Sequence, residues 1–340
     1  MSRKYGIGVV GATGAVGREF LSVMEERGFP VGELRLWASS RSKGRQLEFN
    51  GEKHTVDVLS EDALSGLDFV LISASGAISR EVAPKVASAG AIAIDDSSAF
   101  RYDDDVPLVV PEVNAADLAS HEGIVAIPNC STTPIVQALS PLHDEIPLCR
   151  LIADTYQSVS GAGGLAMDEL RIQTQAIGRG ESVPVNSDVF PHQIASNLIP
   201  SIDDPRDDGY SKEEWKVSAE TRKIMHLPDL AVSATCVRVP VFRAHAAAVH
   251  AEFARPFRVE HARSILEGTA GVRVVDDLAS EQYPMPSTAA GNDTTWVGRI
   301  RADMSHPNGI VFWVVSDNLR KGAATNSIQI VESMIDQGLR

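Results

Sequence analysis

The stretch YGIGVVGATGAVGREFLSVMEERG, residues 5–28, decides the fold of the first part of the chain. Residues 5–10 form a short apolar run that is typical of a buried strand, and a glycine-rich loop follows it directly. Residues 15–28 then place apolar side chains at helical spacing and end at Gly28, a common helix stop. These apolar positions are Val16, Phe20, Val23 and Met24. The stretch therefore predicts a strand, a tight glycine turn and a helix.

The rest of the first part continues this alternation of strand and helix signals. Apolar runs that predict strands lie at residues 34–38, 68–74, 91–95 and 124–128, and a helical pattern lies among them at residues 78–90. Strands that alternate with helices form parallel sheets with right-handed crossovers. We therefore predict an α/β fold with an N-terminal doubly wound, Rossmann-like parallel sheet.

The second part of the chain has a different pattern, with longer strand-like stretches. They lie at residues 150–160, 231–242 and 245–257, with helical patterns at 164–178 and about 211–226. Residues 179–210 are rich in Pro, Asp, Ser and Asn and predict an ordered loop or a connection between lobes. The tail 322–338 is amphipathic and predicts a helix. This pattern favours an antiparallel or mixed sheet, and thus a second, α+β domain.

The glycine loop is a GxxGxxG relative of the dinucleotide-binding fingerprint. Glycines let the main chain approach a pyrophosphate, and the helix that follows offers its N-terminal N–H groups to the anion. A tight turn in an unrelated α/β fold is the structural alternative, but the strand before the loop and the helix after it favour cofactor binding. The predicted cofactor residues here are Gly11, Ala12, Thr13, Gly14, Ala15, Val16 and Gly17.

The residues after the second predicted strand indicate which dinucleotide binds. A site for NAD usually places Asp or Glu there, to accept a hydrogen bond from the ribose 2′-OH. This chain instead has Ser39, Ser40, Arg41 and Ser42, and no carboxylate. Hydroxyls and a cation suit a 2′-phosphate, so we predict NADP as the cofactor. A solvated basic turn is the structural alternative.

Cys130 stands in the frame AIPNCSTTP, residues 126–134, at the end of a predicted strand and just before a helix start. The pair Thr133–Pro134 resembles an N-cap followed by proline at the first helical position. A thiolate is stabilised near a helix N-terminus, and beside a nicotinamide it could attack a carbonyl carbon. A buried packing cysteine is the alternative, and Cys149 and Cys236 fit that alternative well.

Composition excludes several classes of protein. The chain of 340 residues is long enough for two domains, and 31 Lys and Arg against 45 Asp and Glu give a net charge of −14. Such a charge provides no general attraction to nucleic acid or anionic membrane. Three cysteines without a CxxC pair argue against a disulfide framework or a structural zinc site, and the scattered histidines show no metal spacing. From this spacing we expect no bound metal. The sequence also contains no apolar run long enough to span a bilayer, and we expect a cytoplasmic protein.

Motifs along the whole chain carry a family resemblance. They are GATGAVG (11–17), ASSRSKG (38–44), VPLVVPEVN (106–114), PNCSTTP (128–134), TYQSVSGAG (155–163), EEWK…ETRKI (213–224), CVRVPVFRAH (236–245) and WVVSDNLRKGAATNSIQI (313–330). In these motifs the chain resembles the aspartate-β-semialdehyde dehydrogenase family. The resemblance implies NADPH-dependent reductive dephosphorylation of β-aspartyl phosphate to aspartate semialdehyde and phosphate. That reaction belongs to the biosynthesis of lysine and diaminopimelate, threonine, methionine and isoleucine.

The resemblance also implies roles for individual residues. Cys130 is the nucleophile that carries an acyl-thioester, Gln157 orients the acyl group, and His245 takes the thiol proton and later returns it. Arg238 is implied to bind the substrate α-carboxylate and Glu213 its amine. The implied phosphate ligands are Lys216 and Arg101, with Asn129 beside them, and the implied neighbours of the nicotinamide are Ser160, Gly161 and Asn318. The residues alone do not place Arg238 and His245 in one pocket, because Pro240 and the sequence FRAH interrupt strand alternation.

The implied organisation is a discontinuous cofactor domain and a second domain for substrate binding and homodimer formation. We expect the NADP-binding domain to comprise residues 1–131 plus 322–340, and the substrate and dimerisation domain to comprise 132–321. N-acetyl-γ-glutamyl-phosphate reductase, which shares the chemistry, is the nearest alternative, although EEWK and CVRVPVFRAH disfavour it. A non-catalytic NADP-binding redox sensor is the alternative from another class, and Arg101, Lys216 and Arg238 argue against it because a sensor needs no anion site.

Overall fold

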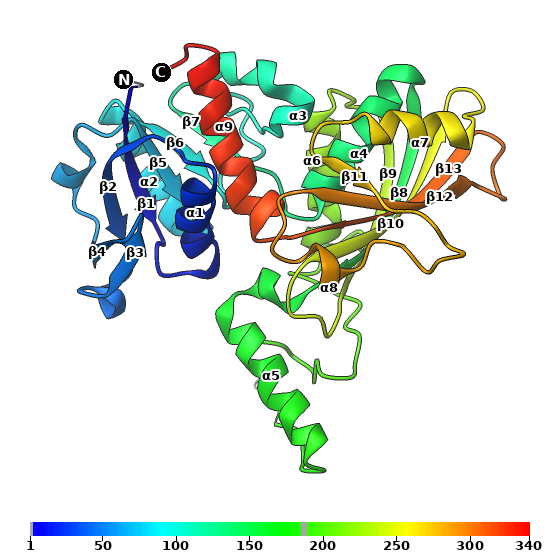
Figure 1. The fold of residues 1–340 in the computed structure, drawn as a ribbon, viewed down its shortest axis with the longest axis horizontal. Helices are drawn as coiled ribbons and strands as arrows, with labels where there is room; N and C mark the ends of the chain where they lie inside the picture. Colours follow the sequence, from blue (N-terminus) through cyan, green and yellow to red (C-terminus); the bar gives the residue numbers. More distant parts are fainter. Residues whose placement is uncertain (1–2, 185–188) are drawn as a thin grey trace. The chain divides into compact units, whose positions relative to one another are not determined.

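The computed structural model describes residues 3–184 and 189–340, and the chain folds into two compact units (Figure 1). Unit 1 comprises the residues up to Pro128 together with Ala323–Arg340, and unit 2 comprises Asn129–Gly322. No helix among the described residues is long and apolar enough to cross a membrane.

Unit 1 contains a seven-stranded sheet in the order β3-β4-β2-β1-β5-β6-β7. The strands are β1 (Tyr5–Val10), β2 (Val31–Trp37), β3 (Gln46–Phe49), β4 (Glu52–Asp57), β5 (Phe69–Ile72), β6 (Ile92–Asp95) and β7 (Ile124–Ala126). All neighbours pair in parallel except β3 and β4, which form an antiparallel hairpin at the edge. The predicted doubly wound parallel sheet is confirmed, whereas the β3–β4 hairpin was not predicted.

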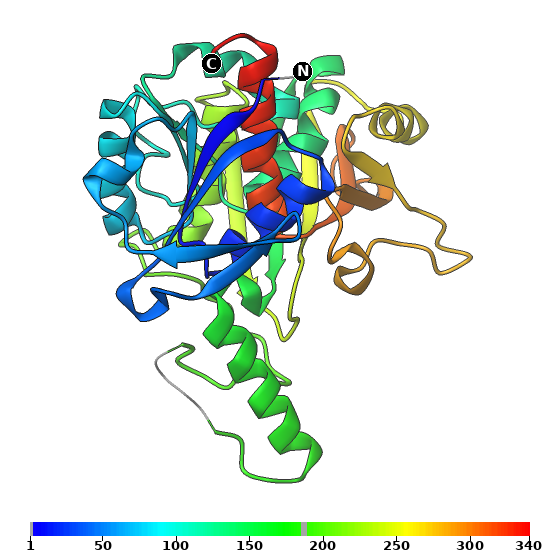
Figure 2. The same ribbon diagram turned by 60° about the vertical axis from the view of Figure 1, so that its left-hand side comes forward.

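Helices cover both faces of this sheet. The helices of unit 1 are α1 (Ala15–Glu26), α2 (Gly76–Ser88), α3 (Pro111–Asn114) and α9 (Thr325–Asp336). Alternate strand residues such as Ile7, Val9 and Leu71 pack with apolar side chains of α1 and α9 in one core. Helix α2 contacts β5, β6 and β7. Figures 1 and 2 both show α9, drawn in red, beside α1, so the C-terminal segment completes the core of unit 1.

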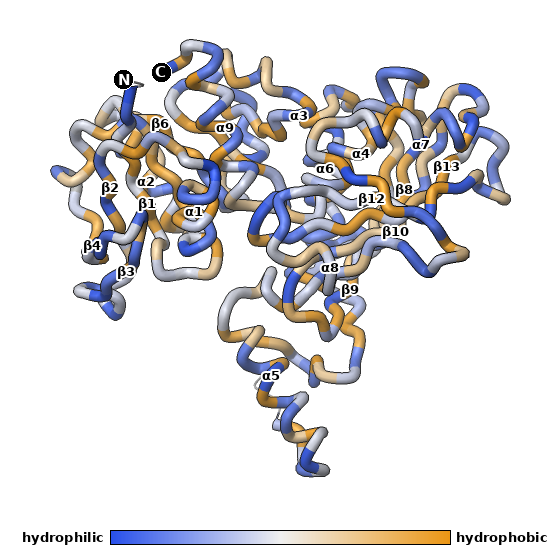
Figure 3. The backbone as a smooth tube through the Cα atoms, viewed as in Figure 1, coloured by the Kyte–Doolittle hydropathy of each residue, from blue (hydrophilic) through white to orange (hydrophobic). Residues whose placement is uncertain are grey.

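Unit 2 contains a six-stranded mixed sheet in the order β11-β12-β13-β10-β8-β9. The strands are β8 (Leu148–Gln157), β9 (Ala231–Arg238), β10 (His245–Phe253), β11 (Val272–Val274), β12 (Thr295–Ala302) and β13 (Gly309–Ser316). The pairs β8–β9 and β11–β12 are parallel and the other pairs are antiparallel, so the predicted mixed sheet is confirmed. Figure 3 shows hydrophobic residues along these strands and hydrophilic residues gathered in the connections.

The helices of unit 2 are α4 (Thr132–Glu145), α5 (Gly164–Gly178), α6 (Lys212–Ile224), α7 (Val259–Glu267) and α8 (Pro286–Ala289). Helices α4, α6 and α7 contact one another and the sheet, whereas α5 extends away from the sheet in both ribbon views. The bounds of α5 match its prediction. The described parts of the predicted loop 179–210 contain no helix or regular strand, and residues 185–188 of it lie outside the described residues.

The start of α4 differs from its prediction. The sequence predicts Thr133 as the N-cap and Pro134 as the first helical residue, but the helix begins at Thr132. The reason is that the carbonyl oxygen of Asn129 already accepts hydrogen bonds from the N–H groups of Thr132 and Thr133. Pro134 thus lies in the first turn, where a missing N–H group leaves no helical bond broken.

One edge of the sheet in unit 2 gathers residues that are distant in sequence. Strands β8 and β9 run in parallel and end side by side, with Gln157 opposite Arg238. Strand β10 runs the other way and begins at this edge, where His245 pairs with Ser316 at the end of β13. The strand order therefore brings four strand ends to one edge of the sheet. The alternation of residues along each strand could not predict this, because it does not indicate which strands are neighbours.

Candidate functional site

Hydrogen bonds to Asn129 fix the turn that carries Cys130. Asn129 Oδ1 accepts from the N–H of Ser131 at 2.8 Å, and its main-chain oxygen accepts from the N–H groups of Thr132 and Thr133 at 2.9 and 3.1 Å. The Cys130 Sγ atom lies 3.7 Å from the same Oδ1. The partly buried thiol therefore stands directly before the first turn of α4, whose N–H groups favour a negative charge.

Glu213 is a buried carboxylate that three of the predicted site residues share. Its Oε1 atom accepts from Asn129 Nδ2 at 2.8 Å and from Gln157 Nε2 at 2.9 Å, and Lys216 Nζ lies 3.2 Å from its Oε2 atom. The Thr155 hydroxyl donates to Gln157 Oε1 at 3.0 Å. The Gln157 amide is therefore held at both ends, and one carboxylate links it to the residue before Cys130.

Glu213 and Lys216 are held in their charged forms. Burial by itself raises the pKa of Glu213, but the Lys216 ammonium and the amide donors hold that pKa below its ordinary value. Burial likewise disfavours the Lys216 ammonium, yet Glu213 and Asp203 raise its pKa above the ordinary value. Asp203 Oδ2 lies 2.5 Å from Lys216 Nζ. The site thus contains a buried anion and a cation with two carboxylate partners.

Arg238 and His245 meet at Gly161. A Cβ atom added at Gly161 would lie 3.0 Å from Arg238 Nη1 and 3.1 Å from His245 Nε2. Burial lowers the pKa of Arg238, and the negative groups at Glu213 and Cys130 raise it in part. The guanidinium of Arg238 and the imidazole of His245 therefore lie close together, in space that a side chain at position 161 would fill.

The ring of His245 has a defined hydrogen-bonding state. Its Nδ1 atom accepts from the main-chain N–H of Ser158 at 3.0 Å. The main-chain oxygen of Ser158 in turn accepts from Arg238 Nη1 at 2.7 Å. Because Nδ1 accepts, the neutral ring carries its hydrogen on Nε2, which is buried and has no hydrogen-bond partner among the described residues. Burial and then the Arg238 charge hold the pKa of His245 well below 6.5.

Asn318 connects the surroundings of His245. Its Oδ1 atom accepts from the hydroxyls of Ser158 and Ser160 at 3.1 and 3.0 Å and from the N–H of Ala244 at 3.0 Å. The Ser158 hydroxyl also lies 3.0 Å from His245 Nδ1. The loop after β13 therefore holds both the turn after β8 and the residue before β10.

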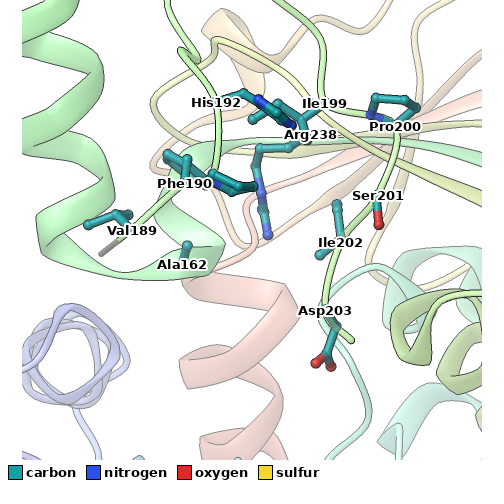
Figure 4. Close-up of a pocket in the computed structure, with 11 residues that line it drawn as sticks. Ala162, Val189, Phe190, His192, Ile199, Pro200, Ser201, Ile202, Asp203 and Arg238 are labelled. Carbon is teal, nitrogen blue, oxygen red and sulfur yellow. The ribbon is translucent and has the colours of Figure 1, made fainter. Parts of the chain in front are cut away.

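A cavity of about 570 Å³ opens beside Arg238. Its lining is mostly apolar and includes Phe190, Ile199 and Ile202, with Arg238 and Asp203 as the charged members (Figure 4). A small ligand with a carboxylate and an apolar contact surface fits such a lining.

The predicted cofactor residues of unit 1 lie together. Gly11 has φ +85°, and a Cβ atom there would lie 2.0 Å from the carbonyl oxygen of Ser73. A Cβ atom at Gly17 would lie 2.2 Å from the carbonyl oxygen of Gly11, so α1 packs closely on the loop. The Thr13 hydroxyl lies 3.1 Å from that of Ser42, which joins the glycine loop to the turn after β2. The loop thus fits a dinucleotide site.

The turn after β2 presents polar groups to solvent. Ser40–Ser42 form one 3₁₀ turn, in which Ser42 is buried, while Ser39, Ser40 and Arg41 are exposed. Arg101, the remaining predicted phosphate ligand, also belongs to unit 1 and donates from Nη2 to the carbonyl oxygen of Asp96 at 2.9 Å. Burial raises the pKa of Asp96 to about 7.

Sequence reasoning missed several residues of this arrangement. Ser158 supplies the N–H for His245 and the carbonyl for Arg238, Asp203 contacts Lys216, and Glu220 contacts the turn of Cys130. Glu220 lies in the motif ETRKI, which contributes to the family resemblance, but the resemblance implied no role for this residue. The other two depend on main-chain groups or on a loop, for which sequence spacing gives no signal.

Gly322 lies against Cys130, and a larger residue there should lower stability. A Cβ atom at position 322 would lie 2.8 Å from Cys130 Cβ and 3.1 Å from its Cα, so the main chain must shift. We expect Gly322→Ala to lower the free energy of unfolding by about 1–3 kcal/mol, the usual range for overpacking. Urea unfolding of the intact chain measures this change.

Gly164→Ala is the matched control for this measurement. Gly164 begins α5, and outside its own helix and chain neighbours no atom of the described residues lies within 4 Å of an added Cβ atom. We expect this variant to unfold at the same urea concentration as the parent chain or a higher one. Equal stabilities of the two variants would contradict the contact between Gly322 and Cys130.

Comparisons with known proteins add a family assignment to this geometry. The family model described as semialdehyde dehydrogenase, NAD binding domain, matches residues 6–121, and that described as semialdehyde dehydrogenase, dimerisation domain, matches residues 139–321. Aspartate-semialdehyde dehydrogenase of Aquifex aeolicus is 50% identical over 338 residues, which cover 98% of this chain and 99% of the relative. That of Bacillus subtilis is 48% identical over 340 residues and covers 98% of both chains.

Solved structures give the same result. Aspartate semialdehyde dehydrogenase II from Vibrio cholerae superposes with a TM-score of 0.95 at 45% identity, over 98% of this chain and 99% of that one. A second structure of the Vibrio cholerae enzyme, described as complexed with ASA, gives the same values.

Proposed function

The chain belongs to the aspartate-semialdehyde dehydrogenase family of oxidoreductases, and from this premise we propose how its residues reduce β-aspartyl phosphate to aspartate semialdehyde and phosphate. The observation that carries the proposal is the shared carboxylate of Glu213, which links Gln157 to the Asn129–Cys130 turn. Hydrogen bonds thereby connect three residues with different roles. Cys130 is the nucleophile, Gln157 orients the acyl group, and Glu213 is the anion for the substrate amine.

Cys130 forms the covalent bond to the substrate. Its thiolate, favoured by the N-terminal N–H groups of α4, attacks the acyl carbon of β-aspartyl phosphate. The sulfur–carbon bond forms, the carbon–oxygen bond to phosphate breaks, and phosphate leaves with the electron pair. The product of this step is a thioester on Cys130.

The charged groups of unit 2 orient the substrate during this step. Arg238 binds the α-carboxylate as a fork, and Glu213 binds the α-ammonium group, for which its charged state is required. Gln157 orients the acyl oxygen. Lys216 and Arg101 bind the phosphate, with Asn129 beside it.

His245 acts as a hydrogen-bond donor in the second half of the reaction. When bound, the nicotinamide supplies the hydride that reduces the thioester. Negative charge then develops on the former carbonyl oxygen, and the Nε2–H of His245 stabilises it. The carbon–sulfur bond breaks as the aldehyde forms, and Cys130 leaves as a thiolate. A proton-shuttling role is less favoured, because a proton on Nδ1 would displace the N–H of Ser158.

Unit 1 binds the dinucleotide, and we propose that it prefers NADP. Support comes from the glycine loop and from the turn Ser39–Ser42, which offers hydroxyls and an arginine where sites for NAD place a carboxylate. The residues proposed to contact the cofactor include the loop 11–17, this turn, and Ser160, Gly161 and Asn318 of unit 2. We retain residues 1–131 plus 322–340 as the proposed extent of the cofactor domain.

Arg41→Ala should separate the two dinucleotides. Loss of a cation at the 2′-phosphate is expected to raise KM for NADP⁺ about tenfold or more, with little change in KM for NAD⁺. Initial rates with each dinucleotide measure the effect. Arg45→Ala is the control, because this arginine is also exposed and lies just beyond the proposed contact. Equal changes in both KM values would contradict the assignment.

The reaction is tested in its reverse direction. Aspartate semialdehyde, NADP⁺ and inorganic phosphate should give a phosphate-dependent rise in nicotinamide absorbance. No rise under conditions where NADP⁺ binds would exclude the proposed reaction.

Unit 2 is the proposed site of homodimer formation. The family model that matches residues 139–321 is described as a dimerisation domain. Large apolar side chains are exposed in this unit, among them Leu165 and Ile172 on α5 and Phe242 before β10. Burial of these side chains against a second copy supplies a driving force for association. The cytoplasmic location expected from the sequence stays a prediction.

A further inference from the structure

Glu220 contacts the turn of Cys130 through the main chain of Asn129. Its side chain is fully buried on α6, and Oε2 accepts from the main-chain N–H of Asn129 at 2.6 Å. Glu220 lies seven residues after Glu213, which is about two helical turns and therefore the same face of α6. Two carboxylates on one helix face thus bind the same residue.

These two carboxylates complete the hydrogen bonding of Asn129. Glu220 binds the main-chain N–H, and Glu213 binds the side-chain Nδ2 at 2.8 Å. The remaining two polar atoms, the main-chain oxygen and Oδ1, accept from N–H groups of residues 131–133 at the start of α4. Every polar atom of Asn129 therefore has a partner, and its rotation is restrained from both α4 and α6.

We propose that Glu220 is a positioning residue for the nucleophile, acting through the Asn129 peptide rather than on the substrate. The proposal rests on the role of Cys130 given above. The Asn129 N–H is buried beside the residue that must present its thiol to an acyl carbon, so its acceptor fixes the direction of the turn. A carboxylate makes a shorter and stronger bond to an N–H than a neutral acceptor does.

Loss of this acceptor should impair chemistry more than binding. Without Glu220 the buried N–H is unsatisfied, and the turn can move to find another partner. The phosphate and dinucleotide ligands remain in place, so their KM values should change little. Displacement of a nucleophile by about 1 Å costs about 10²-fold in rate.

The test compares four variants in the phosphate-dependent assay. We expect Glu220→Ala to lower kcat by about 10- to 100-fold, with KM for phosphate and NADP⁺ within about threefold of the parent values. Glu220→Gln keeps an acceptor oxygen and should retain kcat within about threefold. Glu220→Asp keeps the carboxylate on a shorter side chain, and its kcat should lie between those of the alanine and glutamine variants. This variant keeps the test informative if the alanine variant does not fold.

Glu214→Ala is the matched control. Glu214 lies on the same helix and also binds main-chain N–H groups, those of Ser211 at 2.7 Å and Cys236 at 3.1 Å, but it does not contact the Cys130 turn. This variant should lose stability and keep kcat within about threefold. An equal loss of kcat in Glu214→Ala, a glutamine variant as poor as the alanine variant, or full activity in Glu220→Ala would overturn the proposal.

A measurement that needs no substrate tests the positioning role of Glu220 independently of the proposed reaction. Alkylation of Cys130 by iodoacetamide, followed by mass spectrometry across pH, reports on the thiol alone. We expect its rate profile to change in Glu220→Ala and to match the parent profile in Glu220→Gln and Glu214→Ala. An unchanged profile in Glu220→Ala would overturn the proposal, whereas failure of the reaction itself would appear in the parent enzyme.

Discussion

Cys130→Ser is expected to lower kcat by about 10³-fold or more. A serine hydroxyl is a far weaker nucleophile than a thiolate at neutral pH, and the N-terminal N–H groups of α4 do not make up that difference. The thioester cannot form, so no acyl-enzyme should be found by mass spectrometry after incubation with aspartate semialdehyde and NADP⁺. Binding of NADP⁺, followed by fluorescence titration, should be unchanged.

Cys149→Ser is the control for this variant. Cys149 is exposed on β8 and carries no proposed role, so the same chemical change there should leave kcat unchanged. Turnover of Cys130→Ser near the parent rate would remove the thioester from the mechanism. Loss of NADP⁺ binding in that variant would indicate damage to the fold and not to the chemistry.

His245→Ala is expected to lower kcat by about 10²- to 10³-fold, the usual effect of losing one donor to a developing oxyanion. His245→Gln places an N–H group near the position of Nε2 and should recover a large part of that loss. Burial and the Arg238 charge hold the pKa of His245 well below 6.5, so the neutral ring is favoured at pH 7 and above. At these pH values the parent enzyme and His245→Gln should therefore show the same pH dependence of kcat.

The pH profile distinguishes the donor role from a proton shuttle. A shuttle requires the ring to accept and return a proton, so its kcat profile would contain an ionisation near the working pH that is lost in both variants. Equal and complete inactivity of His245→Gln and His245→Ala, together with such an ionisation in the parent enzyme, would refute the donor role.

The sequence was most informative where local chemistry dictates structure. The glycine loop, α1 and α5 follow from short-range patterns, and their predicted positions agree closely with the structure. The β3–β4 hairpin was missed because most of its residues are polar, and its apolar members, Leu47, Phe49 and Val56, form alternations too short to predict a strand. The start of α4 was misplaced because a carbonyl of Asn129, and not a side-chain cap, opens the helix.

The candidate site was predictable in its members but not in its geometry. Motif resemblance named Arg238 and His245, yet only the order of strands β10, β8 and β9 explains why residues at two different strand ends meet. The main chain of Ser158 binds both His245 and Arg238, and the identity of its side chain gave no indication of these two contacts. The motif that contains Glu220 gave it no role, because only tertiary packing reveals that its carboxylate is buried against the Cys130 turn.

The place of α9 has a consequence for the order in which the chain matures during synthesis. Strands β1–β7 are made first, but their core includes Ile328, Val331 and Met334, and Arg27 of α1 pairs with Glu332, 305 positions further along. Such long-range contacts form only when α9 has left the ribosome. The unit that is synthesised first is therefore completed last, after all of unit 2 is available to fold.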